Sequence, residues 1–315
     1  MKPSHNFEQQ GFVLLDGGLA TELESRGHDL NHNLWSAKLL MDTPEEICQV
    51  HLDFLNAGAD CIITATYQAS IRGFMKEGMS RAEAEALIQT AVDMAAQARD
   101  QFLEDNDDPL RVRPWVAASV GPYGAFLADG SEYRGDYSAT DSELRSFHNS
   151  RWELLKNSDA DVFAFETIPS IREAEVLLEI LKATPGSYAW ISFSCKDELH
   201  ICDGTPISEC AKLFGDCEQI LAVGINCTAP RFVPSLIQKV NHFAPTKPVV
   251  IYPNSGETYD EHSKNWSGAK DVIDFGRSAQ HWFELGARFI GGCCRTTPIH
   301  ISDMRSALLR TVNRK

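Results

Sequence analysis

The chain of 315 residues lacks several features that mark other classes of protein. No apolar run approaches the roughly 20 residues that a membrane helix needs, and we expect no membrane partner. The first ten residues, MKPSHNFEQQ, have neither the charge nor the apolar centre of a secretory or transit peptide. We therefore expect a cytoplasmic protein. No linker or low-complexity tract interrupts the sequence, so residues 1–315 are predicted to form a single domain.

Basic residues are also scarce. The sequence has 29 lysines and arginines against 44 aspartates and glutamates, which gives a net charge of −15. Proteins that bind nucleic acid usually present a basic face, so no nucleic-acid partner is expected. An acidic chain is compatible with small-molecule substrates, including cationic ones. These features leave the oligomeric state open.

Cysteine is plentiful, but its usual arrangements are missing. An odd number of cysteines, nine, in a long chain without a signal peptide argues against a disulfide framework. No Cys-x-x-Cys pair occurs, which excludes zinc-finger and zinc-ribbon sites. Most of the thiols are expected to be reduced and buried. Any metal site must be assembled from segments that lie far apart in the sequence.

Short apolar runs alternate with amphipathic segments along the whole chain. Their length and nearly continuous hydrophobicity are typical of buried parallel strands. Eight such runs are present, at residues 12–17, 61–66, 115–120, 162–167, 189–194, 221–226, 248–253 and 288–293.

The segments between the runs carry helix signals. The S/T-x-x-E pattern of a capping box occurs at residues 43–46, 80–83, 140–143 and 170–173. Gly58 and Gly286 precede strands, as left-handed helix C-caps do, and Thr297-Pro298 predicts the start of a last helix. Eight β–α units of this length favour an α/β fold of the (β/α)8 TIM-barrel type. A doubly wound sheet is the alternative.

Polar residues stand where several predicted strands end. Each has an ordinary explanation when taken alone: an aspartate favours turns, a glutamate caps helices, and a single cysteine is usually a core thiol. In a barrel, however, all these positions lie on the catalytic face. The residues are Asp16, Gly17 and Gly18; Glu166 and Thr167; Asn226 and Cys227; Asn254; and Cys293 and Cys294.

Two adjacent cysteines at one strand end, with a third at another, suit a zinc site with three thiolate ligands. Cys293 and Cys294 reach one metal only if the strand breaks there, and we expect Gly291 and Gly292 to supply the backbone freedom. Cys227 would reach the same metal across the end of the seventh strand. Three protein ligands leave the fourth tetrahedral position open, as in catalytic zinc sites.

Two other classes of protein use zinc sites of related composition. A zinc hydrolase on a barrel would place histidines at strand ends, and the ten histidines of this sequence do not fall there. A non-enzymatic zinc module would close the tetrahedron with a fourth protein ligand. Cys195, which follows the fifth predicted strand, is the candidate for that ligand.

With these motifs in place, the sequence resembles the homocysteine S-methyltransferases, in particular the branch that uses S-methylmethionine. The resemblance covers essentially the whole chain. It is carried by LLDGGLATELESRG (14–27), LWSAKLL (34–40), TATYQAS (64–70), SVGPYGAFLADGSEYRGDY (119–137), GINC (224–227), YPNSGE (252–257) and GGCCRTTP (291–298).

The resemblance implies a TIM barrel, one zinc ion held by Cys227, Cys293 and Cys294, and methyl transfer from S-methylmethionine or S-adenosylmethionine to homocysteine. Selenocysteine and selenohomocysteine methyltransferases of the same family are the alternative. Asp16 and Glu166 match the acids that bind homocysteine in this family, and we expect neither to act as a general base. No catalytic residue is expected beyond the zinc site. The predicted substrate-binding residues are Asp16, Gly17, Gly18, Tyr67, Glu166 and Asn226.

A cationic methyl donor also invites aromatic contacts. Four aromatic residues of the predicted loops are candidates to face the donor: Trp35, Tyr67, Phe126 and Tyr133. Arg295 follows the cysteine pair and either anchors a substrate carboxylate or pairs with an acid at the barrel end.

Overall fold

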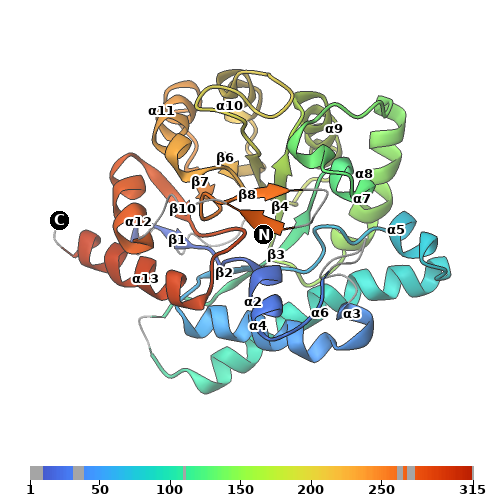
Figure 1. Ribbon diagram of the computed structural model, residues 1–315, viewed down its shortest axis with the longest axis horizontal. Helices are drawn as coiled ribbons and strands as arrows, with labels where there is room; N and C mark the ends of the chain where they lie inside the picture. Colours follow the sequence, from blue (N-terminus) through green and yellow to red (C-terminus); the bar gives the residue numbers. More distant parts are fainter. Residues whose placement is uncertain (1–9, 31–38, 109–110, 261–264, 268–273, 314–315) are drawn as a thin grey trace.

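Eight parallel strands form the centre of the molecule, with helices packed around them (Figure 1). The computed structural model describes residues 10–30, 39–108, 111–260, 265–267 and 274–313. The strands are β1 (Val13–Leu14), β2 (Cys61–Ile63), β3 (Trp115–Val120), β4 (Val162–Ile168), β5 (Ala189–Phe193), β6 (Ile220–Asn226), β7 (Val249–Tyr252) and β10 (Ala287–Ile290). Each of the eight predicted strands is confirmed.

The strands follow one another around the barrel in the order β1-β10-β7-β6-β5-β4-β3-β2. The two ends of this series meet, because Leu15 and Cys61 form a parallel bridge. The amide of Asp16 donates to the carbonyl of Cys61 at 3.0 Å, and that of Asp60 donates to Leu14 at 2.6 Å. These bonds join β1 to β2, and the predicted (β/α)8 barrel is confirmed.

Helices link the strands and cover the outside of the barrel (Figure 1). They are α2 (Leu19–Ser25), α3 (Leu39–Asp42), α4 (Pro44–Asn56), α5 (Ile71–Lys76), α6 (Arg81–Asp105), α7 (Tyr123–Leu127), η2 (Ser131–Tyr133), α8 (Asp141–Leu155), α9 (Ile171–Lys182), α10 (Ile207–Gly215), η3 (Pro230–Phe232), α11 (Val233–Phe243), α12 (Phe275–Glu284) and α13 (Pro298–Val312).

The helix signals are mostly confirmed. Ser80 and Thr140 form capping boxes at the start of α6 and α8, and α13 begins at Pro298. The left-handed C-cap glycines predicted before β2 and β10 have φ values of 110° and 111°. The boxes predicted at 43–46 and 170–173 are wrong, since neither Thr43 nor Ser170 makes a side-chain cap.

The interior of the barrel is filled by side chains that alternate along the strands with those facing the helices. Large residues contributed by β5, β7 and β10, namely Trp190, Tyr252 and Phe289, pack among small ones such as Ala164 and Ala222. The hydroxyl of Tyr252 accepts a hydrogen bond from Trp190 Nε1 at 3.1 Å and lies 2.7 Å from Ser192 Oγ. Tyr252 therefore closes the top of this core and forms the base of the space above it.

Two long loops follow strands at the top of the barrel. The β3 loop, residues 121–138, contains α7 and η2. The segment after β7 contains a small antiparallel hairpin of β8 (Thr258–Asp260) and β9 (Asn265–Ser267). The loops that follow parallel strands carry the active sites of TIM barrels.

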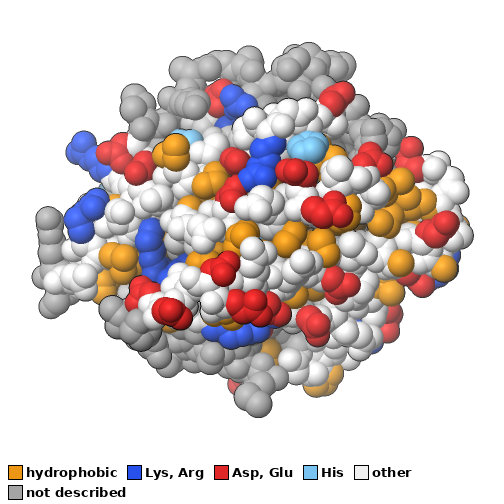
Figure 2. Space-filling model, turned by 90° about the horizontal axis from the view of Figure 1, so that it is seen from below, with side chains coloured by type: hydrophobic (Ala, Val, Ile, Leu, Met, Phe, Trp, Pro, Cys, Tyr) orange, Lys and Arg blue, Asp and Glu red, His pale blue; other side chains and the backbone are white. Residues whose placement is uncertain are grey.

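Acidic and basic side chains are interspersed with apolar ones on the face shown in Figure 2. Within the described part of the chain, no helix is both long enough and apolar enough to cross a lipid bilayer.

Candidate metal and substrate site

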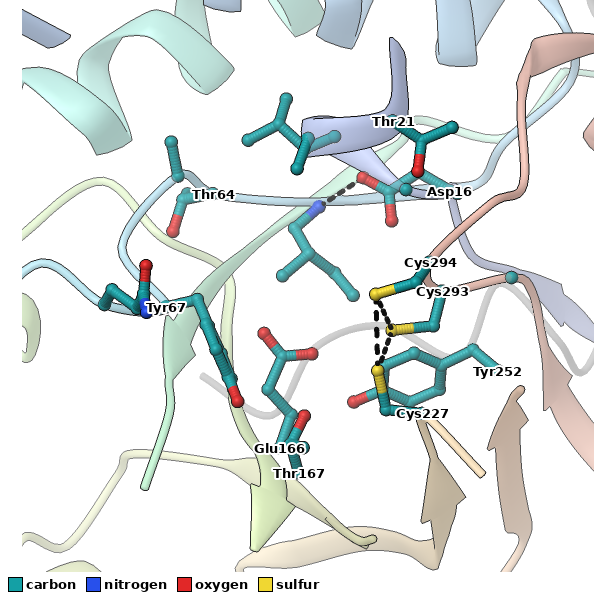
Figure 3. Close-up of a pocket in the computed structure, with 18 of the residues that line it drawn as sticks. Asp16, Thr21, Thr64, Tyr67, Glu166, Thr167, Cys227, Tyr252, Cys293 and Cys294 are labelled. Carbon is teal, nitrogen blue, oxygen red and sulfur yellow. Dashed lines mark hydrogen bonds between the residues drawn. The ribbon is translucent and has the colours of Figure 1, made fainter. Parts of the chain in front are cut away.

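A pocket opens at the top of the barrel, where the strands end (Figure 3). It encloses about 820 Å³ of empty space, which includes open solvent at its mouth. Its described lining contains no lysine, arginine or histidine. It does contain Asp16, Tyr67, Gln68, Glu132, Tyr133, Glu166, Thr167, Tyr252 and the three predicted zinc ligands, Cys227, Cys293 and Cys294.

The sulfurs of Cys227, Cys293 and Cys294 converge on one side of the pocket (Figure 3). Cys227 Sγ lies 2.8 Å from Cys293 Sγ and 3.6 Å from Cys294 Sγ, and the other two sulfurs are 4.0 Å apart. Zn–S bonds of about 2.3 Å in a tetrahedron place sulfurs about 3.8 Å apart. Two of the three separations match this value, and the shortest needs to open by about 1 Å.

The ionisation of the cysteine cluster is also compatible with a bound cation. Hydrogen bonds from Cys293 and Cys294 lower the pKa of Cys227 well below its ordinary value, while the pKa values of the two donors are raised. One thiolate is thus stabilised by two thiols, and a metal ion would replace both protons. Among the described residues, no fourth histidine, cysteine, aspartate or glutamate joins this cluster. Cys195, the candidate for a closed site, is not part of it.

The end of β7 brings the cysteines together. The carbonyl of Tyr252 accepts from the amide of Cys227 at 3.2 Å, and that of Pro253 accepts from the amide of Cys293 at 2.9 Å. Because β7 lies between β6 and β10, its last residues anchor both cysteine-bearing segments.

Gly291 and Gly292 act differently from the prediction. Neither has a positive φ, whereas Cys227 and Arg295 have φ values of 46° and 68°. The glycines are needed because the chains approach closely. A Cβ at 291 would lie 2.6 Å from the Cβ of Leu15, and one at 292 would lie 2.3 Å from Thr296 Oγ1. Left-handed backbone occurs instead at Arg295, directly after the cysteine pair, and separately at Cys227 after β6.

Two buried carboxylates face the pocket beside the sulfurs. Asp16 Oδ2 accepts a hydrogen bond from the amide of Ile63 at 2.8 Å, and Glu166 Oε1 accepts one from the hydroxyl of Ser119. Burial raises the pKa of Asp16 well above its ordinary value, and it raises the pKa of Glu166 to about 7. Burial makes both acids costly to ionise, so together they form a ready site for a cationic group.

Asn226 lies next to this pair but does not line the pocket. Its amide oxygen accepts from the amide of Thr167 at 2.7 Å, and its amide nitrogen donates to the hydroxyl of Thr167 at 2.7 Å. Thr167 has a φ of 58°, which is rare for a β-branched residue. Asn226 is therefore better described as a residue that holds Thr167, and with it Glu166, in place.

The other predicted residues are distributed as follows. Tyr67, Gly17 and Gly18 line the pocket, although the amide of Gly18 is already bonded to Thr296. Tyr133 also lines it, with its hydroxyl 3.8 Å from Cys227 Sγ. Phe126 instead packs against Tyr123 and Phe147. Trp35 lies outside the described residues, and Asn254 caps its own turn through Gly256.

Arg295 pairs with an acid at the barrel end, one of its two predicted roles. Its Nε lies 3.2 Å from Glu257 Oε2, in the segment after β7. Glu132 and Gln68 also line the pocket, and the sequence analysis missed both. Their positions next to predicted aromatic residues were a signal, but only the fold shows that they point to the same space.

Known proteins similar to this chain match it over nearly its whole length. A family model described as homocysteine S-methyltransferase matches residues 13–308. The homocysteine S-methyltransferase YbgG of Bacillus subtilis is 51% identical over 95% of both chains. The selenocysteine Se-methyltransferase of Brassica oleracea is 45% identical over 96% of this chain and 90% of its own. The metallated homocysteine methyltransferase MmuM of Escherichia coli superimposes with a TM-score of 0.87 at 42% identity, covering 97% and 99% of the two chains.

Proposed function

Because this chain belongs to the homocysteine S-methyltransferase family, we propose that it transfers a methyl group from S-methylmethionine to L-homocysteine and so forms methionine. S-adenosylmethionine is proposed as a second donor. The observation that carries this proposal is the composition of the pocket. Three converging thiols lie beside two buried carboxylates, and the described lining residues include no basic side chain.

The reaction is balanced without any further reactant. The homocysteine thiol loses its proton to solvent when it binds. A bond then forms between its sulfur and the donor methyl carbon. The bond from that carbon to the donor sulfonium breaks, and its electron pair stays on the donor sulfur as a neutral thioether. With S-methylmethionine, both products are methionine.

Cys227, Cys293 and Cys294 are the residues that would hold the zinc ion. When bound, the zinc ion supplies a Lewis acid that keeps the homocysteine thiol deprotonated near neutral pH, where a free thiol is only about 3% ionised. Three thiolate ligands also make this end of the pocket negative, which attracts a sulfonium and favours a step that cancels charge. Histidine ligands, which acidify water in hydrolases, would not have this effect.

Asp16 and Glu166 are proposed to bind the ammonium of homocysteine. Both are buried, so a cation between them would restore the ionised carboxylates and make charge-assisted hydrogen bonds. Gly17 is the remaining candidate among the two glycines to hold the substrate carboxylate through its amide. Neither acid is proposed as a general base, because the thiol has already lost its proton.

Tyr67 is proposed to contact the donor. Its side chain lies across Glu166 from the three sulfurs, with its hydroxyl directed toward Glu166 and Thr167 (Figure 3). An aromatic ring in this position suits a sulfonium, which is attracted to the face of a ring as other cations are. Tyr133, close to Cys227, offers a second ring.

A methyl-transfer assay with paired acceptors and donors tests the proposed function. Homocysteine and selenocysteine are each combined with S-methylmethionine, S-adenosylmethionine or betaine, and the methylated product is measured. We expect kcat/KM to be highest for homocysteine with S-methylmethionine. A preference for betaine would overturn the proposed donor, and a preference for selenocysteine would replace the proposed acceptor.

A further inference from the structure

Gln68 has a buried side-chain oxygen that has no hydrogen-bond donor among the described residues. The side chain is 9% exposed and lines the pocket. Its Nε2 donates to the carbonyl of Ala125 at 3.2 Å, and since a carbonyl only accepts, this contact determines the orientation of the amide. Its Oε1 is buried without a hydrogen-bond donor among the described residues. A donor N–H from a bound molecule would satisfy this oxygen.

Glu132 provides a second buried polar side chain to the lining of this pocket. It belongs to η2 in the β3 loop, is 7% exposed and lines the pocket with Gln68. Helix α7, which carries Ala125, packs directly on it: a Cβ at Gly124 would lie 2.6 Å from the Glu132 amide nitrogen. The carbonyl of Glu132 also accepts from Ser194 Oγ at 3.0 Å. Gln68, α7 and Glu132 therefore form one contiguous wall.

A buried cluster of His148, Arg151 and Glu173 forms hydrogen bonds to both ends of the β3 loop. Arg151 Nη2 donates to the carbonyl of Gly121 at 2.6 Å. Glu173 Oε1 accepts from the amide of Tyr123 at 2.6 Å, and its Oε2 accepts from the hydroxyl of Tyr137. Glu173 was predicted to cap α9, but it turns inward to make these contacts. The loop is thus preorganised rather than adjustable at its base.

The same cluster also holds the segment of Gln68. An arginine can only donate, so its contact with His148 makes Nδ1 an acceptor and the ring a neutral imidazole, and burial lowers the pKa of His148 in the same sense. Nε2–H then donates to Glu173 at 2.6 Å, while Nδ1 accepts from Arg151 at 3.3 Å. Arg151 Nη1 donates in addition to the carbonyl of Tyr67 at 3.2 Å. One set of buried groups therefore positions both halves of the wall.

We propose that Gln68 Oε1 and the Glu132 carboxylate accept hydrogen bonds from the α-ammonium of the methyl donor. The enzyme then selects a sulfonium that is also an amino acid. This inference rests on the proposed function, in which two amino acids bind at once and each brings an ammonium. Asp16 and Glu166 serve the acceptor, and Gln68 and Glu132 serve the donor. Betaine has a quaternary nitrogen without an N–H, so it would leave the buried Gln68 Oε1 without a donor.

Glu132→Gln tests the charge of this subsite with little change in shape. We expect the KM for S-methylmethionine to rise about 10- to 100-fold, because a charge-assisted hydrogen bond becomes a neutral one. The KM for homocysteine and the zinc content should stay at their wild-type values. Asp136→Asn is the matched control, since it removes an acid from an exposed part of the same loop.

A donor without its amino group separates this role from a general effect on the pocket. 4-Dimethylsulfoniobutanoate, which is S-methylmethionine without the amine, should react with wild-type enzyme about 10- to 100-fold less efficiently than S-methylmethionine. In Glu132→Gln the two donors should react with similar efficiency, because the variant has lost the charge that binds the donor ammonium. Gln68→Leu provides the same comparison from a different loop, should Glu132→Gln fail to fold.

The outcomes are distinct. Equal penalties for the amine-free donor in wild type and in both variants would overturn the role of Gln68 and Glu132 while leaving S-methylmethionine as the donor. Loss of homocysteine binding in Glu132→Gln would also overturn it and assign Glu132 to the acceptor. Wild-type enzyme that does not react with S-methylmethionine at all would overturn the proposed function itself.

Discussion

Cys293→Ser is expected to lose zinc and methyl transfer together. A serine hydroxyl stays protonated near neutral pH and is a poor replacement for a thiolate ligand. Loss of groups that merely orient metal ligands costs about 10- to 100-fold in affinity or activity, so loss of a ligand should cost more than about 100-fold in kcat/KM. Zinc content by elemental analysis and methionine formation check the two effects on the same preparation.

Cys217→Ser is the matched control, because Cys217 is also a partly exposed free cysteine but lies outside the zinc cluster. It should retain full zinc content and activity. Stoichiometric zinc in Cys293→Ser would remove Cys293 from the ligand set. Full activity in a zinc-free variant would contradict the role of the metal altogether.

Glu166→Gln is expected to weaken homocysteine binding more than catalysis. The variant keeps an oxygen that accepts from Ser119 but loses the charge that attracts the substrate ammonium. Replacing a charge-assisted hydrogen bond should raise the KM for homocysteine about 10- to 100-fold, with kcat nearly unchanged. Glu175→Gln, an exposed change on α9, serves as the control. A fall in kcat with an unchanged KM would show that Glu166 acts on the chemical step.

The pH dependence of homocysteine binding provides an independent test of the same residue. Burial raises the pKa of Glu166 from 4.5 to about 7. Its carboxyl is therefore neutral below that pH and ionised above it. The wild-type KM for homocysteine should rise as the pH falls through about 7 and level off at higher pH.

In Glu166→Gln this rise should be smaller, because only Asp16 still titrates within the pair. The pH profile of kcat should keep its shape. Loss of its basic limb in the variant would instead identify Glu166 as a general base. The KM and kcat profiles, measured with saturating donor, distinguish the two roles.

Much of the fold was predictable because buried parallel strands leave a strong local signal. All eight apolar runs became strands, and Ser80 and Thr140 capped helices as their patterns indicated. The zinc ligands were predictable for a similar reason. Strand ends share one face of a barrel, so cysteines after β6 and β10 had to meet if the barrel formed.

The roles of other residues depended on the direction in which their side chains point, which the local sequence does not encode. Glu173 follows the spacing of a capping box, yet burial against His148 and Tyr137 outweighs an exposed cap. Asn226 stands at a strand end like the ligands, but its amide turns to Thr167 of β4, two strands away in the barrel. Side chains of adjacent residues in a strand point to opposite faces. A shift of one position therefore determines whether a side chain lines the pocket or instead supports a residue that does.

The sequence by itself therefore determined the barrel, the family and the three thiols, because each follows from regular hydrophobic spacing or from a specific motif. Only the tertiary structure decided how those thiols meet and what faces them. The end of β7 anchors both cysteine segments, and Gly291 and Gly292 serve close packing rather than a turn. Gln68 and Glu132 lie 64 positions apart in the chain. They share a pocket wall because α7 packs between their loops and a buried ionic cluster holds both.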